Sequence, residues 1–293
     1  MNEVLRSILS NGCVTSEDGK IRTLESAISQ EEGDFIQEMI RSARPRVSLE
    51  VGCAYGISSL YICEALREVG AGRHIIMDPY QHSEWEGIGL ANLRRAGYLD
   101  IADFHEAPSY QYLSRLAEEA LKIDFAFIDG HHVFDYVFVD FFLIDKLLRP
   151  GGVVILDDLS WPPVRSVCRY VLANLRYKCI GPQMRELPER TAWRKVMSGV
   201  RQDGMSQLLR APLRRIFRPA GRMLMWRVGQ LVNAPLRRIP GSTTSLTDSR
   251  LNLPYYSNYV ALQKLADGYW THHERPIPST VTLVDVHLPT DRY

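Results

Sequence analysis

The stretch from residue 47 to residue 60, VSLEVGCAYGISSL, constrains the fold of this chain more than any other feature. A short apolar run leads to Glu50, and glycines follow at positions 52 and 56, directly before a helical pattern. This order predicts a buried strand, a glycine turn and the start of a helix. A glycine turn lets the backbone approach a bound molecule, and the helix offers it free N–H groups. The spacing E-x-G-x-x-x-G is not the G-x-G-x-x-G pattern of dinucleotide sites.

From residue 47 onward, short apolar runs alternate with amphipathic helical patterns. This alternation predicts an α/β fold: a Rossmann-like, doubly wound, mostly parallel seven-stranded sheet with helices on both faces. Five core strands are expected at residues 47–51, 74–77, 101–105, 123–128 and 153–156, with a closing pair near 177–180 and 192–196. The intervening helices are expected near residues 57–69, 84–97, 109–121, 134–148 and 162–175.

Residues 1–46 are expected to be accessory and helical. Ser29 and Glu32 form a capping-box pattern, and the helix that follows them is expected to stop at Pro45. This helix either covers a ligand pocket or packs against the edge of the sheet.

Polar residues follow the predicted strands at the edge where doubly wound sheets bind ligands. Asp78 follows the second core strand, Asp129 the fourth, and the pair Asp157 and Asp158 the fifth. Because the fourth and fifth strands are expected to be neighbours, three carboxylates would meet at one edge and repel one another unless a cation lies between them. Oxygen ligands of this kind suit Mg²⁺ or Ca²⁺.

The glycine turn, Asp78 and the segments IDGHH and LDD together resemble class I S-adenosylmethionine-dependent methyltransferases. The resemblance is to metal-dependent O-methyltransferases of the catechol, caffeoyl-CoA and macrocin types and to a bacterial group with an I-D-G-x-H signature. It implies methyl transfer from S-adenosylmethionine to a hydroxyl of a small molecule or glycan, assisted by Mg²⁺. It assigns the cofactor to Glu50, Gly52, Cys53, Gly56, Asp78 and Asp129, and the metal to Asp129, Asp157 and Asp158. His132, three residues beyond Asp129, is expected to take the proton of the acceptor, and residues 106–109 fall where the family's adenine-facing loop lies.

Several of these residues also have plain structural interpretations. Asp78 suits a turn before Pro79, and Asp157 or Asp158 suits the cap of the helix that starts near residue 162. His131 is expected to point away from the site, and either histidine also suits a structural role. The segment with Trp85, Gly87 and Gly89 forms either a lid or a packed helix entry. At the level of function, the alternatives are a metal-independent N- or O-methyltransferase and a catalytically inactive cofactor-binding protein anchored by a basic tail.

The composition of the 293 residues is that of an ordinary globular protein, with 45% hydrophobic residues, 24% charged residues and a net charge of +1. Nothing in this balance indicates a nucleic-acid partner. The five cysteines form no C-x-x-C pair, and the N-terminus lacks the apolar core of a secretory signal. We therefore expect free thiols and a cytoplasmic location, with a homo-oligomer as one possible assembly.

Beyond Ser198 the alternation stops. Residues 199–240 contain nine arginines, no lysine and one acid, Asp203, so their local charge is +8. Such a segment contacts a membrane or another anionic surface, or is a solvated insertion. The expected organisation is therefore accessory helices at 1–46, a methyltransferase core at 47–198 and an Arg-rich extension at 199–293, whose last part folds back as a helix and an edge strand.

Overall fold

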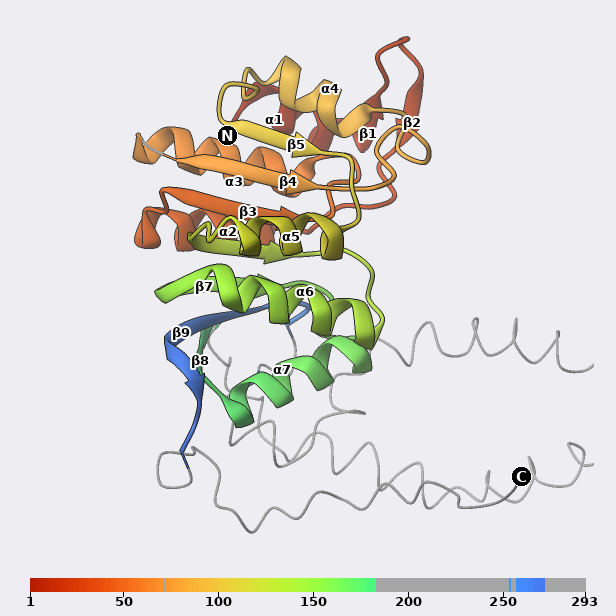
Figure 1. Cartoon of the computed structure of the whole chain (residues 1–293). Helices are drawn as coiled ribbons and strands as arrows, with labels where there is room; N and C mark the ends of the chain where they lie inside the picture. Colours follow the sequence, from red (N-terminus) through yellow and green to blue (C-terminus); the bar gives the residue numbers. More distant parts are fainter. Residues whose placement is uncertain (71, 183–252, 254–256, 272–293) are drawn as a thin grey trace, which may run out of the picture. The chain divides into compact units, whose positions relative to one another are not determined.

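The computed structural model describes residues 1–70, 72–182, 253 and 257–271 (Figure 1). In this part of the chain a seven-stranded sheet carries helices on both faces, as the alternating pattern predicted. The strand order is β5-β4-β3-β6-β7-β9-β8, and β9 runs antiparallel to both of its neighbours. The strands of this sheet are β3 (Val47–Val51), β4 (Arg73–Met77), β5 (Ala102–His105), β6 (Ile123–Ile128), β7 (Leu148–Leu156), β8 (Leu175–Gly181) and β9 (Val260–Tyr269).

Two apolar layers, one on each face of the sheet, hold the helices in place. One face, which carries Leu49 and Val51, is covered by α5 (Ser109–Glu118), α6 (Phe134–Leu147) and α7 (Pro162–Asn174). The other face, which carries Phe125 and Phe127, is covered by α1 (Glu3–Asn11), α2 (Gln30–Ala43), α3 (Ile57–Val69) and α4 (Ile88–Arg95). None of the helices in the described ranges combines the length and the apolar character that a membrane span requires.

Helix α2 begins where the capping pattern predicted. The Ser29 hydroxyl accepts a hydrogen bond from the backbone N–H of Glu32 at 3.1 Å. The helix packs on α3 and also contacts β6 and β7, so it lies over the middle of the sheet and not at an edge. The residues before it differ from the all-helical expectation, because β1 (Cys13–Thr15) and β2 (Ile21–Thr23) form an antiparallel hairpin. Its turn contains Asp18 and Gly19, a common turn pair that the sequence analysis passed over.

The last strands of the sheet depart most from the sequence prediction. The strand expected at residues 177–180 is β8, whereas its expected partner at 192–196 lies outside the described residues, as does the basic segment 199–240. The last part of the extension was expected to fold back as a helix and an edge strand, whereas residues 260–269 form β9, which lies in the interior of the sheet between β7 and β8. Both neighbouring strands supply hydrogen-bond partners, and Val260, Ala261 and Leu262 are fully buried. The sheet therefore includes residues beyond Ser198.

A buried lysine ties β9 to the end of α6. Lys264 is only 1% exposed, and its Nζ lies 3.1 Å from Oδ1 of Asp145 and 2.7 Å from Oδ1 of Asp267. The same Nζ donates to the backbone carbonyls of Asp145 and Leu148 at 2.6 and 2.9 Å. Tyr177 on β8 donates its hydroxyl to Asp145 at 2.9 Å. This network fixes the antiparallel strand against the body of the sheet.

Candidate active site

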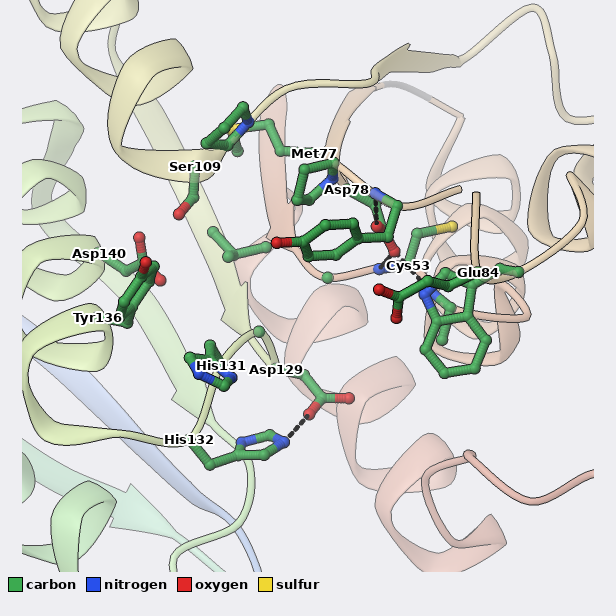
Figure 2. Close-up of a pocket in the computed structure, with 18 of the residues that line it drawn as sticks. Cys53, Met77, Asp78, Glu84, Ser109, Asp129, His131, His132, Tyr136 and Asp140 are labelled. Atoms are coloured by element: carbon green, nitrogen blue, oxygen red, sulfur yellow. Dashed lines mark hydrogen bonds and ion pairs between the residues drawn. The ribbon is translucent and has the colours of Figure 1, made fainter. Parts of the chain in front are cut away.

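A cavity of about 540 Å³ opens at the carboxyl ends of β3, β4 and β6 (Figure 2). This is the edge at which doubly wound sheets bind ligands. Five of the residues predicted from the sequence line the cavity, namely Gly52, Cys53, Asp78, Asp129 and His132. Glu50, Gly56, Asp157 and Asp158 are not among the residues that line it.

The glycine turn after β3 forms part of the cavity wall. Gly52 has a φ of 90°, and a Cβ atom at this position would lie 2.1 Å from the backbone oxygen of Asp129. Its N–H donates to the carbonyl of Met77 at 2.9 Å. The turn is thus pressed between the loops that follow β4 and β6, and only glycine fits there. A ligand at this point meets backbone atoms instead of a side chain.

Asp78 joins two of the loops that surround the cavity. Its Oδ2 accepts hydrogen bonds from the backbone N–H groups of Cys53 and Ala54 at 3.0 and 2.9 Å. Its Oδ1 accepts from the N–H of Tyr80 at 2.8 Å, which is the local turn bond of the plainer interpretation. The carboxylate therefore makes the turn and also holds the glycine loop, and it remains part of the cavity wall.

Glu50 and Gly56 shape the turn from behind. The fully buried Glu50 carboxylate accepts a hydrogen bond from the Ser59 hydroxyl and lies 3.0 Å from Nε2 of His74. Nδ1 of the same imidazole is 2.9 Å from the hydroxyl of Ser48. Gly56 caps α3, and a Cβ atom there would lie 3.1 Å from Cα of Gly89. Both residues contact the protein interior, and neither lines the cavity. The cofactor role assigned to them stays a prediction.

The segment between β4 and α4 combines the two alternatives left open for it. Trp85 lines the cavity, and its ring packs edge-on against Tyr55 at 5.1 Å between centroids. Gly87 is the N-cap of α4, and a Cβ atom on Gly89 would lie 2.6 Å from the carbonyl of Ala54. The aromatic ring is therefore part of the cavity wall, while the glycines are the packed entry of the helix.

The loop after β5 contributes to the cavity only through its last residues. Pro108 and Ser109 line the cavity, whereas Glu106 turns toward His82, with its Oε2 2.6 Å from Nδ1 of that imidazole.

An acidic cluster with one imidazole lies beside the glycine turn. Nε2 of His132 is 3.0 Å from Oδ2 of Asp158 and 4.0 Å from Oδ1 of Asp129, and Figure 2 shows the latter contact. One potential ligand atom from each of these three residues lies within 4.8 Å of the others. His131 packs edge-on against Tyr136, away from the carboxylates, but it also lines the cavity, so the expectation that it points away from the site was wrong. The loop after β6 therefore directs one histidine toward the carboxylates and the other toward the opposite wall.

Asp157, the third predicted metal ligand, lies behind this cluster. Its Oδ1 accepts from the N–H of Asp158 at 2.6 Å and from the side-chain amide of Asn258 at 2.9 Å. The same amide lies 3.2 Å from Oδ1 of Asp158, so Asn258 links the two aspartates. Neither aspartate caps α7, because the N-cap position of that helix is Trp161. The capping alternative is thus excluded.

Glu32 on α2 is a fourth carboxylate that the sequence analysis missed. It is 2% exposed, and its Oε1 has no hydrogen-bond partner among the described residues. Burial, followed by the charges of Asp157 and Asp129, raises the pKa of Glu32 to about 10. Burial, followed by the charges of Asp157 and Asp158, also raises the pKa of Asp129 well above its ordinary value. In the sequence, the capping-box pattern accounted for Glu32 as part of a helix start. No second pattern indicated that this side chain approaches Asp157 and Asp129.

The donor set fits a divalent cation. Two carboxylates and an imidazole converge, and the buried acids around them raise one another's pKa, which a cation would reverse. Carboxylate oxygens suit Mg²⁺ and Mn²⁺, and an imidazole nitrogen shifts the preference toward Mn²⁺. Asp129 and Asp158 are the residues that would hold the ion, with Asp157 and Asn258 orienting Asp158.

The strand order, with one antiparallel strand next to the last, and the acidic residues at the strand ends agree with the resemblance seen in the sequence. Comparison with known proteins agrees: residues 49–159 match the family model of a methyltransferase domain. This part of the chain is thus similar to methyltransferase domains.

Caffeoyl-CoA O-methyltransferases of plants are among the curated relatives. Caffeoyl-CoA O-methyltransferase 1 of Eucalyptus globulus is 28% identical over 151 residues, which cover 49% of this chain and 59% of that protein. Caffeoyl-CoA O-methyltransferase 2 of Zea mays is 31% identical over 136 residues, which cover 45% of this chain and 49% of that protein. The chain thus spans about half to three fifths of the length of these relatives.

Among solved structures, the O-methyltransferase from Bacillus cereus in complex with SAH has the same fold. The TM-score is 0.50 at 21% identity, with 61% of this chain and 83% of that chain covered.

Proposed function

We propose that this protein is an O-methyltransferase that moves the methyl group of S-adenosylmethionine to a hydroxyl of a small molecule or glycan, with a divalent cation such as Mg²⁺ assisting. The observation that carries the proposal is the position of the His132 imidazole. Its Nε2 lies 3.0 Å from a carboxylate oxygen of Asp158 and 4.0 Å from one of Asp129, in the same cavity as Gly52 and Asp78.

Different residues at the cavity would have different roles in the reaction. The backbone of Gly52 and Cys53 and the carboxylate of Asp78 would hold the cofactor. A cation held by Asp129 and Asp158 would lower the pKa of an acceptor hydroxyl and fix its oxygen. In the transfer, the acceptor oxygen forms a bond to the methyl carbon and the C–S bond of the sulfonium breaks, with its electron pair kept by sulfur. With the Asp158 carboxylate turned to the cation and no longer accepting from the imidazole, Nε2 of His132 would be free to take the hydroxyl proton.

The same geometry supports a second role for His132, as a third ligand of the cation. The two roles predict different results for His132→Ala. If His132 is the base, we expect the rate of methyl transfer to fall about 10²- to 10⁴-fold while Mn²⁺ affinity, measured by calorimetry without acceptor, stays unchanged. If His132 is a ligand, the affinity for Mn²⁺ falls as well.

Titration calorimetry with S-adenosylhomocysteine, with and without Mg²⁺, tests the proposal as a whole. We expect cofactor binding in the wild type and in Asp129→Ala, with a separate Mg²⁺ signal that only Asp129→Ala loses. Asp135→Ala removes an exposed carboxylate from α6 and serves as the matched control. Absence of cofactor binding by the wild type would contradict the proposal.

Chelation tests the metal part separately. Activity that survives complete removal of divalent cations would leave the metal-independent alternative, in which the carboxylates position an amine or a hydroxyl. The basic segment 199–240 as an anchor on an anionic surface, the cytoplasmic location and a homo-oligomer stay predictions.

A further inference from the structure

Helix α6 carries apolar side chains on its outer face as well as on its inner face. The inner face packs on the sheet through Val137, Phe141 and Ile144, which are 4%, 1% and 0% exposed. The outer face carries Phe142 and Val139, which are 48% and 39% exposed. A helix that covers a sheet normally turns polar residues to the solvent. The outer face of α6 therefore has the composition of a surface that another molecule or segment covers.

The apolar surface extends beyond these two outer residues. Phe134, at the start of the helix, is 48% exposed and stacks on Phe138 at 5.7 Å between ring centroids. The ring of Phe138 packs edge-on against Tyr170 of α7, which is 38% exposed. Helix α6 is the middle one of three helices on this face of the sheet, between α5 and α7 (Figure 1). The apolar surface thus lies in the centre of this helical layer.

Four residues of the outer face form a stripe with a symmetric order, namely Asp135, Val139, Phe142 and Lys146. They are separated by four, three and four residues, a spacing that keeps them on one side of an α-helix in the seam pattern of paired helices. The order along the stripe is acid, apolar, apolar, base, and all four side chains are exposed. The partly buried Phe138 and Leu143 flank the stripe at equal distances in sequence from its midpoint.

We propose that the outer face of α6 is the contact surface for a second copy of this chain, with the two α6 helices antiparallel about a two-fold axis. Each residue of the stripe then meets its counterpart counted from the other end, as an isologous contact requires. Val139 packs on Phe142 of the partner subunit, and Asp135 pairs with Lys146 of the partner subunit. A parallel arrangement would place like charges opposite one another.

The charges of the stripe favour a second copy over other occupants. The basic segment 199–240, with its local charge of +8, would be attracted by Asp135 but repelled by Lys146. An anionic membrane surface would attract Lys146 and repel Asp135. A partner that carries both charges in the reverse order satisfies both ends, and an antiparallel second α6 supplies that order. The inference concerns a surface and does not depend on the proposed reaction.

Sedimentation equilibrium of the full chain, without cofactor or metal, measures the dissociation constant of the dimer. We expect the wild type to dimerise, and Phe142→Glu, which buries a carboxylate in the middle of the contact, to raise the dissociation constant more than about 100-fold. Leu99→Glu, at a 47% exposed apolar position in the turn between α4 and β5, is the matched control and should leave the constant unchanged. Because both positions are exposed in a single copy, we expect neither variant to change the far-UV circular dichroism spectrum.

Charge exchange tests the antiparallel register. Asp135→Lys places like charges at both ends of the contact and should raise the dissociation constant about tenfold or more, and Lys146→Glu should do the same. The double variant Asp135→Lys/Lys146→Glu restores opposite charges and should return to within about threefold of the wild type. Asp135→Ala removes the attraction without adding repulsion and should have a smaller effect than Asp135→Lys.

Each outcome decides the inference. Dissociation by Phe142→Glu together with recovery in the double variant supports it. A wild type that stays monomeric at about 100 µM overturns it. A dimer that Phe142→Glu leaves intact also overturns it, because the contact would then lie elsewhere. If Phe142→Glu dissociates the dimer but the double variant does not recover, the antiparallel pairing is wrong, and binding of a monomeric wild type to anionic vesicles that Phe142→Glu abolishes would assign the face to a membrane.

Discussion

Replacing Glu32 by glutamine should stabilise the protein in the absence of metal. The pKa of Glu32 is raised from 4.5 to about 10 in the folded state, so folding keeps a proton on this group that the unfolded chain releases. For a group whose folded pKa is raised, the stabilisation is complete below the unfolded pKa of 4.5 and is lost as the pH rises toward about 10. Each pH unit between these limits costs about 1.4 kcal/mol.

At pH 7.5 the cost therefore approaches about 4 kcal/mol, since this pH lies about three units above the unfolded pKa. Glutamine has nearly the same shape, keeps an N–H donor toward Asp157 and has no proton to lose. We expect Glu32→Gln to raise the free energy of unfolding by about 2 to 4 kcal/mol at pH 7.5, and by less than about 1 kcal/mol at pH 4.5.

Urea denaturation in EDTA at the two pH values measures this difference. Glu38→Gln, an exposed position on the same helix, is the matched control and should change stability by less than about 0.5 kcal/mol at either pH. An equal effect of Glu32→Gln at both pH values, or a loss of stability at pH 7.5, would show that the Glu32 carboxylate is ionised and compensated in the folded protein, and the reasoning would fail.

Two further substitutions test the turn and the buried lysine. Gly52→Ala places a Cβ atom 2.1 Å from a backbone oxygen and should lower the melting temperature and abolish binding of S-adenosylhomocysteine, whereas Gly70→Ala, at a φ of 75° with no atom within 4 Å, should cost only about 1 kcal/mol of backbone strain. Lys264→Met leaves a buried carboxylate without its cation and should cost about 3 to 5 kcal/mol in urea denaturation. Lys178→Met, at an exposed position on β8, is its control, and an equal small loss in both variants would refute the role of the buried lysine.

Much of the sheet and of the cavity could be predicted because both depend on local patterns. Apolar runs alternating with amphipathic stretches locate the strands and helices of a parallel sheet, and ligands bind at the carboxyl ends of such strands. Gly52, Asp78, Asp129 and His132 therefore reach one cavity from residues far apart in the chain. Their order along the sequence was sufficient to place them.

The remaining features depend on contacts that a single sequence does not show. Glu50 lies on the strand face opposite Leu49 and Val51, so one oxygen of its carboxylate contacts Ser59 and His74 in the interior. Which face of β3 turns toward α3 is set by tertiary packing, and the same holds for the approach of Glu32 to Asp157.

The strand β9 was missed for a related reason. This strand pairs with β7 and β8 because those two strands are not adjacent to each other in the sheet. No local pattern within residues 260–269 indicates that position. Tertiary placement overrides local propensity in such a strand.

The position of β9 has a consequence for how this domain is made. During synthesis, β7 and β8 leave the ribosome long before Val260, so the sheet has an open slot between them until residues 260–269 emerge. Unpaired strand edges invite pairing with other chains. The nascent protein is therefore most exposed to misassembly while the segment between Gly181 and Val260 is translated. A chain released before Tyr269 would lack part or all of β9, the strand that pairs with both β7 and β8.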